Sequence, residues 1–250
     1  MVSENIYSWF LKESIDKNKF KATIKGRKEE TVFNKQKREL LENLIRKVND
    51  NAKERINFVQ SLIDKARDAL NKNGSFVIDF EAKTTSRLMI NTANGLGFEV
   101  FEIGIAFHPI FNLPYIPSSA IKGSLRSYIH FYNEKEEKYI FGDDEIGKLI
   151  VLDAFPKDYN KTLLDADVIT SIYGEDIEEH KAKPNPVIYP CIAKGVTFRF
   201  VIGISNRIKG DERKDLQSKI FDYFFEMANY GIGAKTLVGY GILEKVSKNG

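Results

Sequence analysis

The 250-residue chain contains one cysteine, Cys191, and only three histidines. One cysteine cannot form a disulfide within the chain, and so few histidines, widely spaced, cannot supply the ligands of a zinc site. No apolar run approaches the roughly 18 residues of a membrane-spanning helix, and the first residues lack the basic and then apolar pattern of a secretory signal. We therefore expect a cytoplasmic protein without membrane contact, metal or other cofactor.

Neither sign of charge dominates, because 38 Lys and Arg residues against 35 Asp and Glu give a net charge of +3. Such a balance does not by itself indicate a nucleic-acid partner. The distribution is uneven, since residues 1–72 carry 17 basic against 11 acidic side chains and the remainder has a net charge of −3. A solvated helical face explains this basic excess as well as a binding surface does.

The first 73 residues are predicted to form a helical region. Apolar side chains recur every three or four residues from Leu41 to Leu70, which is the spacing of one face of an amphipathic helix. Residues 49–51, Asn-Asp-Asn, favour a break within this stretch, because short polar side chains compete for backbone hydrogen bonds. Asn73-Gly74 is typical of a helix end, since glycine tolerates the left-handed conformation there.

The remaining residues, 74–250, are predicted to form an α+β domain whose six elements follow the order β-α-β-β-α-β. The predicted strands are 75–90, 148–155, 195–205 and 237–246, and the predicted helices are 118–132 and 212–230. This order is that of the ferredoxin-like fold, which resembles RNA-recognition domains. Between the second and third strands, residues 156–194 carry four of the seven prolines. We expect a long irregular insert there, which in a compact domain is usually functional or disordered.

A glycine-rich segment, GIGAKTLVGYG at residues 231–241, lies between the last predicted helix and the last predicted strand. It is not a P-loop, because Ala234 precedes Lys235 and a β-branched run follows. It also fails as a dinucleotide fingerprint, because Thr236 takes the place of the third glycine. Its glycines would let the backbone approach another backbone or a phosphate, with Lys235 as the counter-charge. A helix cap followed by a kinked strand would require glycine as well.

The segment LPYIPSSAIKGSLR opens the first predicted helix. Ser118 and Ser119 lie at the predicted helix N-terminus, where free N–H groups attract anions. Lys122, Arg126 and His130 recur at four-residue spacing, so their cations share one helical face. An anionic polymer could lie along this face, and the alternative is an ordinary charged surface.

These two segments resemble motifs of a known family. PYIPSSAIKGSLRSYI is similar to the Pro-Gly-Ser-Ser-x-Lys-Gly-x-Leu-Arg signature of the RAMP superfamily, the repeat-associated RNA-binding subunits of CRISPR systems. GIGAKTLVGYG resembles the C-terminal glycine-rich loop of that superfamily. The segments 94–117, 152–156 and 165–170 are most similar to the sixth-subunit family of the type III-B Cmr effector complexes. Ser118 departs from the pattern, because the superfamily usually has glycine there.

The resemblance implies a subunit that binds guide RNA, together with its paired target RNA, and packs against other Cmr-type RAMP subunits in an antiviral effector complex. The end of the first strand, the start of the first helix and the glycine-rich loop can converge on one side of such a fold. We therefore predict RNA contacts from Lys122, Arg126, Lys235, Ser119, Ser118, Arg87, Gly231, Gly233, Thr236 and Tyr240.

The resemblance also implies a role for the insert between the second and third predicted strands. In related subunits it forms a thumb between guide and target nucleotides, which here corresponds to residues 156–194. The candidate wedges are Tyr159, Ile172, Tyr173 and Ile177. A small satellite core under a long loop would bury the same side chains.

Two nuclease alternatives and one assembly alternative stand beside this hypothesis. Guide processing would need a histidine as general acid or base, and the candidates are His108, His130 and His180. Target cleavage in related subunits uses an aspartate in the loop after the first strand, but residues 91–107 offer only Glu99 and Glu102. We therefore expect a non-catalytic subunit. A purely protein-binding assembly subunit would differ from an RNA-binding one in lacking a steep salt dependence.

Overall fold

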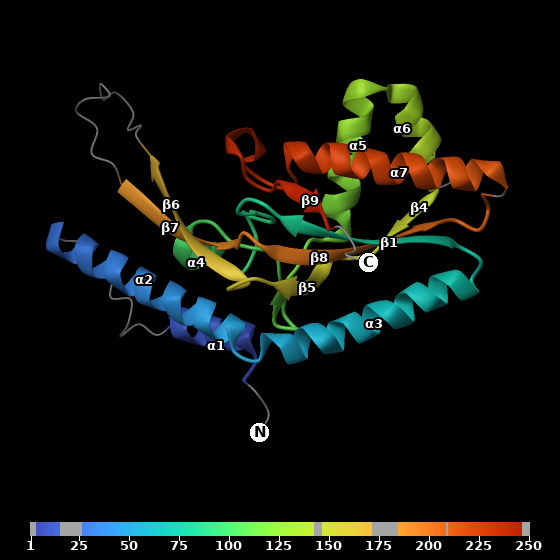
Figure 1. Cartoon of the computed structure of the whole chain (residues 1–250). Coiled ribbons are helices and arrows are strands. Elements are labelled where there is room, and N and C mark those ends of the chain that lie inside the picture. The colour runs from blue at the N-terminus through green and yellow to red at the C-terminus, as the bar shows by residue number, and fades with distance from the viewer. Residues whose placement is uncertain (1–3, 16–26, 143–146, 172–184, 209, 247–250) are drawn as a thin grey trace.

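The centre of the molecule is an antiparallel β-sheet of five strands. The computed structural model describes residues 4–15, 27–142, 147–171, 185–208 and 210–246. The sheet comprises β1 (Phe76–Thr84), β4 (Leu149–Val151), β5 (Phe155–Tyr159), β8 (Val196–Ile204) and β9 (Leu243–Lys245). Its path is β4-β8-β1-β9, and β4 and β5 pair with successive halves of the same edge of β8 (Figure 1). The predicted α+β class is confirmed.

Strand β8 is covered on both faces. It pairs with β1 from Phe76 opposite Ile204 to Lys83 opposite Thr197, and all nine of its residues are buried. Helices α5 (Ser118–Tyr132) and α7 (Asp211–Tyr230) lie on one side of the sheet, and α3 (Ala52–Lys72) lies on the other (Figure 1). The continuous apolar run of β8 fits this two-sided burial.

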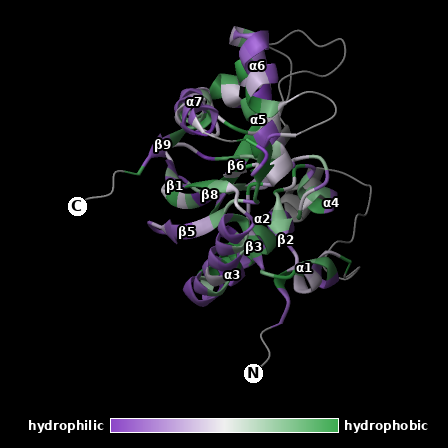
Figure 2. Cartoon of the chain, turned by 90° about the vertical axis from the view of Figure 1, so that its right-hand side faces the viewer, coloured by the Kyte–Doolittle hydropathy of each residue, from purple (hydrophilic) through white to green (hydrophobic). Residues whose placement is uncertain are grey.

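The first 72 residues contain three described helices, α1 (Ile6–Ile15), α2 (Arg27–Asn49) and α3. The break between α2 and α3 falls at the Asn-Asp-Asn cluster, where Asn51 adopts the left-handed conformation with a φ of 54°. Apolar side chains from Leu40 to Ile63 are buried in the same core as those of the sheet. Figure 2 shows hydrophilic residues on the outer sides of α3 and α7 and hydrophobic residues in β1 and β8 between them. No helix of the described part is long and apolar enough to cross a membrane.

The prediction of an irregular insert over 156–194 is wrong for much of its length. Strands β6 (Leu164–Ser171) and β7 (Asn185–Ile192) form a two-stranded hairpin that packs on α2 (Figure 1), and β5 takes up the start of the insert. Its prolines are compatible with strands, because Pro186 and Pro190 lie in a two-stranded ribbon in which every strand has a free edge. Ile172, Tyr173, Ile177 and His180 lie outside the described residues.

The two long predicted helices are confirmed: α5 has the predicted bounds, and α7 begins one residue earlier. Three predicted strands are too long. The first ends at Thr84, the second is split between β4 and β5, and the last is reduced to β9 after a 3-10 turn, η2 (Thr236–Val238). Gly239 and Gly241 have positive φ values of 88° and 75°, which interrupts an extended backbone. The short elements are α4 (Phe98–Phe101), β2 (Phe107–His108), β3 (Leu113–Pro114) and α6 (Glu134–Phe141).

Candidate nucleic-acid interface

The glycine-rich loop is fixed to the segment that follows β1. The N–H of Ala234 donates to the carbonyl of Met89 at 2.8 Å, and the N–H of Gly241 donates to the carbonyl of Arg87 at 2.8 Å. A Cβ atom added to Gly233 would lie 2.2 Å from the carbonyl oxygen of Met89, so this approach requires glycine. Gly231 is similar, since its Cβ would lie 2.5 Å from a backbone oxygen of the same loop. Both glycines therefore serve close contact with backbone of the chain itself.

The tip of this loop is exposed but ordered by its own hydrogen bonds. Thr236 begins the 3-10 turn, and Lys235 and Gly239 flank it in the left-handed conformation. Leu237 is 101% exposed and Val238 is 71% exposed. Aliphatic side chains presented in this way can wedge against unstacked bases. Neither residue was among the predicted RNA contacts, because both lie within the predicted strand 237–246.

A polar cluster joins the loop to the β6–β7 hairpin. Arg87 donates through Nε to Asp165 at 2.9 Å, and its Nη1 lies 3.4 Å from a carboxylate oxygen of Asp167. The Tyr240 hydroxyl donates to Asp167 and lies 3.4 Å from the hydroxyl of Tyr189. Burial, together with these neighbours, raises the pKa of both tyrosines, so both are neutral. Arg87 and Tyr240 thus hold the hairpin against the loop.

A cation lies beside this cluster. The Lys235 ammonium is 5.8 Å from the centre of the Tyr189 ring, and Lys235 is exposed. We call the group of Arg87, Lys235, Leu237, Val238 and Tyr240 the loop site. The loop site presents a cation and an aliphatic tip next to the base of a hairpin.

The N-terminus of α5 is capped from within the chain. The N–H of Ser118 donates to Oδ1 of Asp153 at 2.6 Å. A carboxylate at a helix N-terminus occupies the place that an external anion would take. Ser119 is exposed and Lys122 is half-buried, and neither takes part in an ion pair within the described ranges. We call Ser119, Lys122 and Arg126 the helix site.

Arg126 lies against a buried carboxylate of α6. The Glu137 side chain is 4% exposed, and Nε of Arg126 donates to its Oε1. His130 of the same helical stripe lies 3.7 Å from the other oxygen of Glu137. A buried carboxylate needs such partners, and Arg126, whose side chain is 55% exposed, supplies the positive charge that neutralises Glu137. No hydrogen bond or ion pair in the described part of the chain joins the helix site to the loop site.

Two of the nuclease candidates, His108 and Glu102, make contacts within the fold. The His108 ring stacks on Phe111 at 4.2 Å, and its Nδ1 accepts the N–H of Phe111 at 3.3 Å. Burial lowers the pKa of His108, which favours the neutral ring that this hydrogen bond requires. Glu102 pairs with Lys37 at 3.1 Å. Within the described residues, no group of three or more His, Cys, Asp or Glu side chains could hold a metal ion.

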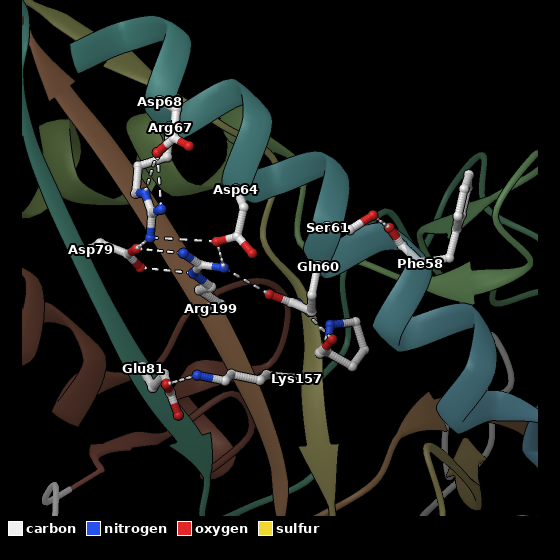
Figure 3. A network of polar contacts seen from close by, with 11 residues as sticks. Phe58, Gln60, Ser61, Asp64, Arg67, Asp68, Asp79, Glu81, Lys157 and Arg199 are labelled. Carbon is white, nitrogen blue, oxygen red and sulfur yellow. Dashed lines mark hydrogen bonds and ion pairs between the residues drawn. The ribbon is translucent and has the colours of Figure 1, made fainter. Parts of the chain in front are cut away.

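The sheet face opposite α5 and α7 carries an ionic network between the buried Arg199 and partly exposed side chains of α3 and β1, drawn in Figure 3. The Arg199 side chain is 8% exposed, donates to both carboxylate oxygens of Asp79 at 2.9 and 2.5 Å, and lies 2.9 Å from Asp64 of α3. Burial raises the pKa of Asp79, but Arg199 and Arg67 outweigh burial and hold that pKa below its ordinary value. RNA-recognition sheets stack bases on an open face, which α3 covers here.

The fold and the glycine-rich loop are those of one protein class: the chain belongs to the RAMP superfamily, whose family model matches residues 81–244. The resemblance drawn from the motifs is thus confirmed. The chain is 36% identical over 188 residues to the CRISPR system CMR subunit Cmr6 of Saccharolobus solfataricus, an alignment that covers 74% of this chain and 64% of that relative. It is 24% identical to the Cmr6 subunit of Pyrococcus furiosus, over 68% of each chain.

A solved structure extends the similarity to nearly the whole chain. A chain of the type III-B Cmr-beta complex, determined by cryo-EM bound to cognate target RNA, superposes with a TM-score of 0.75 and 32% identity. The match covers 97% of this chain and 87% of that chain. The N-terminal helices, which lie outside the family model, are therefore included in this structural similarity.

Proposed function

We propose that this chain is the Cmr6-type subunit of a type III-B CRISPR effector complex. In that role it binds guide RNA with its paired target, packs against other RAMP subunits and does not cleave RNA itself. The observation that carries the proposal is the loop site, in which an ordered glycine-rich loop presents Lys235, Leu237 and Val238 beside the hairpin. The relatives support it, because they are Cmr6 subunits and the similar solved chain comes from a complex with target RNA.

The proposal includes a ferredoxin-like core, residues 74–250, preceded by a helical region, residues 1–73. β1, α5, the β4 and β5 pair, β8, α7 and β9 follow one another as β-α-β-β-α-β. The antiparallel path β4-β8-β1-β9 places the first and third strands at the centre, as the split βαβ arrangement requires. The helical region closes the sheet face and supports the hairpin, which we assign as the thumb.

The loop site suits an RNA whose bases are already paired or splayed. Lys235 offers one cation to a phosphate, and the aliphatic tip offers surface to the face of a base. Neither group reads the identity of a base. Sequence recognition would then be left to guide–target pairing, as in other guide-carrying proteins.

The absence of cleavage is supported by the roles of the described candidates. His108 accepts a backbone N–H and packs in an aromatic cluster, and Glu102 pairs with Lys37. Incubation of the chain with guide RNA, and separately with guide paired to target, in Mg²⁺ or Mn²⁺ tests this part. Products at fixed positions that disappear in Glu99→Ala, Glu102→Ala or His108→Ala would make the protein a nuclease.

The experiment on binding compares two surface variants. Lys235→Ala with Leu237→Ser should weaken binding of a fluorescent single-stranded RNA about tenfold, because the variant loses one phosphate contact and the apolar surface offered to a base. The slope of log K against log salt should also fall by about 0.7 for the lost phosphate contact. Lys53→Ala, which removes an exposed cation from α3, is the matched control. Unchanged affinity and slope in a folded loop-site variant would refute the proposal.

A further inference from the structure

The C-terminal ends of α5 and α7 share an exposed group of aromatic side chains. We call Tyr128, Phe131, Tyr132 and Tyr230 the aromatic patch. Phe131 is 81% exposed, Tyr132 is 56% exposed and Tyr230 is 62% exposed. Ring centres lie 4.8 Å apart for Tyr128 and Tyr132, 5.6 Å for Tyr128 and Tyr230, and 5.2 Å for Phe131 and Tyr132. Contiguous exposed rings of this kind mark interaction sites.

The three tyrosine rings of the aromatic patch are held in place by hydrogen bonds of their hydroxyl groups within the chain. The Tyr132 hydroxyl donates to the Tyr230 hydroxyl at 3.3 Å, and the Tyr128 hydroxyl donates to Glu226 at 3.4 Å. These bonds tie α5 to α7 across 98 residues of sequence. Large rings fixed in this way lose little conformational entropy on binding.

The charge beside the aromatic patch is negative. Asp222 and Glu226 precede Tyr230 by two turns and one turn on the same side of α7. Each accepts a hydrogen bond from a hydroxyl, and neither is paired with a cation in the described part of the chain. Arg126 and His130 of α5 do not compensate these carboxylates, because both face Glu137 instead.

This combination distinguishes between two kinds of partner. An RNA backbone would bring phosphates toward two uncompensated carboxylates, which is unfavourable. A protein surface with arginine or lysine side chains would gain both ion pairs and cation–π contacts with the rings. Tyrosine-rich clusters are also the usual anchors of protein interfaces.

We propose that the aromatic patch, with Asp222 and Glu226, docks a basic segment of a neighbouring protein subunit. The inference rests on the proposed function, in that the chain works within a multisubunit complex. No hydrogen bond or ring contact of the described residues links the aromatic patch to the loop site. The proposal assigns RNA to the loop site and the neighbouring subunit to the aromatic patch, although Tyr230 directly precedes Gly231 of the glycine-rich loop.

The test uses the full chain co-expressed with the other subunits of its complex, one of which carries the affinity tag. Tyr132→Ser with Tyr230→Ser should reduce the share of complexes that retain this subunit about tenfold, as loss of anchor residues does at interfaces. Glu226→Lys should also reduce the share of complexes that retain this subunit. Tyr132→Phe with Tyr230→Phe, which keeps both rings, should assemble like the original chain.

Control variants and assays distinguish an effect on docking from an effect on folding or on RNA binding. Phe58→Ser on α3, 58% exposed, is the matched aromatic control, and Glu42→Lys on α2 is the matched charge control. Thermal unfolding followed by circular dichroism shows that each variant is folded. Binding of fluorescent single-stranded RNA to the isolated chain should be unchanged in the serine variant.

Two results would overturn the inference. Retention of the folded serine variant at the original level would show that the aromatic patch docks nothing in the complex. A loss of RNA affinity in that variant would show that the rings stack on bases. Failure of the unaltered chain to join the complex or to bind RNA would instead contradict the proposed function.

Discussion

Replacing Gly233 by alanine tests how the glycine-rich loop is seated. The residue has a φ of 94°, and an added Cβ would lie 2.2 Å from the backbone oxygen of Met89. Gly239 is the matched control within the same loop. Its φ is 88°, but an added Cβ would meet nothing within 4 Å. The two substitutions therefore share the conformational penalty and differ only in the collision.

The structure allows the magnitude to be worked out. A non-glycine residue at positive φ costs about 1 kcal/mol at the low end of the usual range, and this applies to both positions. At Gly233 the collision is with backbone, so the loop must move, and the hydrogen bond from Ala234 to Met89 is lost. A lost buried hydrogen bond costs about 1–3 kcal/mol. We expect Gly233→Ala to lower the free energy of unfolding by about 2–4 kcal/mol and Gly239→Ala by about 1 kcal/mol.

The assay is urea unfolding followed by circular dichroism, with RNA binding measured by fluorescence anisotropy on the folded proteins. Gly233→Ala should also weaken RNA binding about tenfold, because displacement of the loop carries Lys235 and the aliphatic tip away from the hairpin. Equal stability of the two variants would show that the contact with Met89 does not hold the loop. Full RNA affinity in Gly233→Ala would show that the position of the loop does not matter for binding.

Three further outcomes are expected from other parts of the molecule. Arg199→Met should lower the free energy of unfolding by about 2–4 kcal/mol in urea melts, somewhat less than for a fully buried pair, because Asp79 keeps Arg67 as a partner. Since the pKa of folded Asp79 is lowered from 3.8, this stabilisation is present above that value and is lost as pH falls through the folded pKa. The difference between the original chain and Arg199→Met should therefore shrink in acid, and a constant difference would contradict the ion pair. Asp153→Ala should cost about 1 kcal/mol as a lost helix cap, and it should tighten RNA binding at low salt if the helix site contacts RNA. Unchanged RNA affinity in Asp153→Ala would show that the N-terminus of α5 does not contact RNA.

Local patterns in the sequence were sufficient for the features that depend on neighbours along the chain. The periodicity of apolar side chains gave α5 and α7 nearly to the residue, since a helix satisfies its hydrogen bonds within itself. The two family motifs likewise led to the superfamily, because the loop needs glycine at fixed positions. The break at residues 49–51 coincides with a cluster of residues that compete for backbone hydrogen bonds.

The lengths of the strands and the structure of the insert could not be predicted as well from the sequence, because strands are stabilised by partners elsewhere in the chain. Pairing of β6 with β7 makes strands of segments whose prolines argued against them. The last strand is short because Gly239 and Gly241 take positive φ values in the loop, a conformation that the alternating side chains do not reveal.

The sites were decided by tertiary structure. Lys122, Arg126 and Lys235 looked equivalent as cations in motifs, but Arg126 is bound to a glutamate of the next helix and only Lys235 lies in the ordered loop. The carboxylate at the N-terminus of α5 comes from a residue 35 positions away, and the aromatic patch joins Tyr132 of α5 to Tyr230 of α7, which lie 98 positions apart in sequence. Sequence determines which side chains are available, whereas only the folded chain determines which of them are already neutralised by one another and which remain free for a partner.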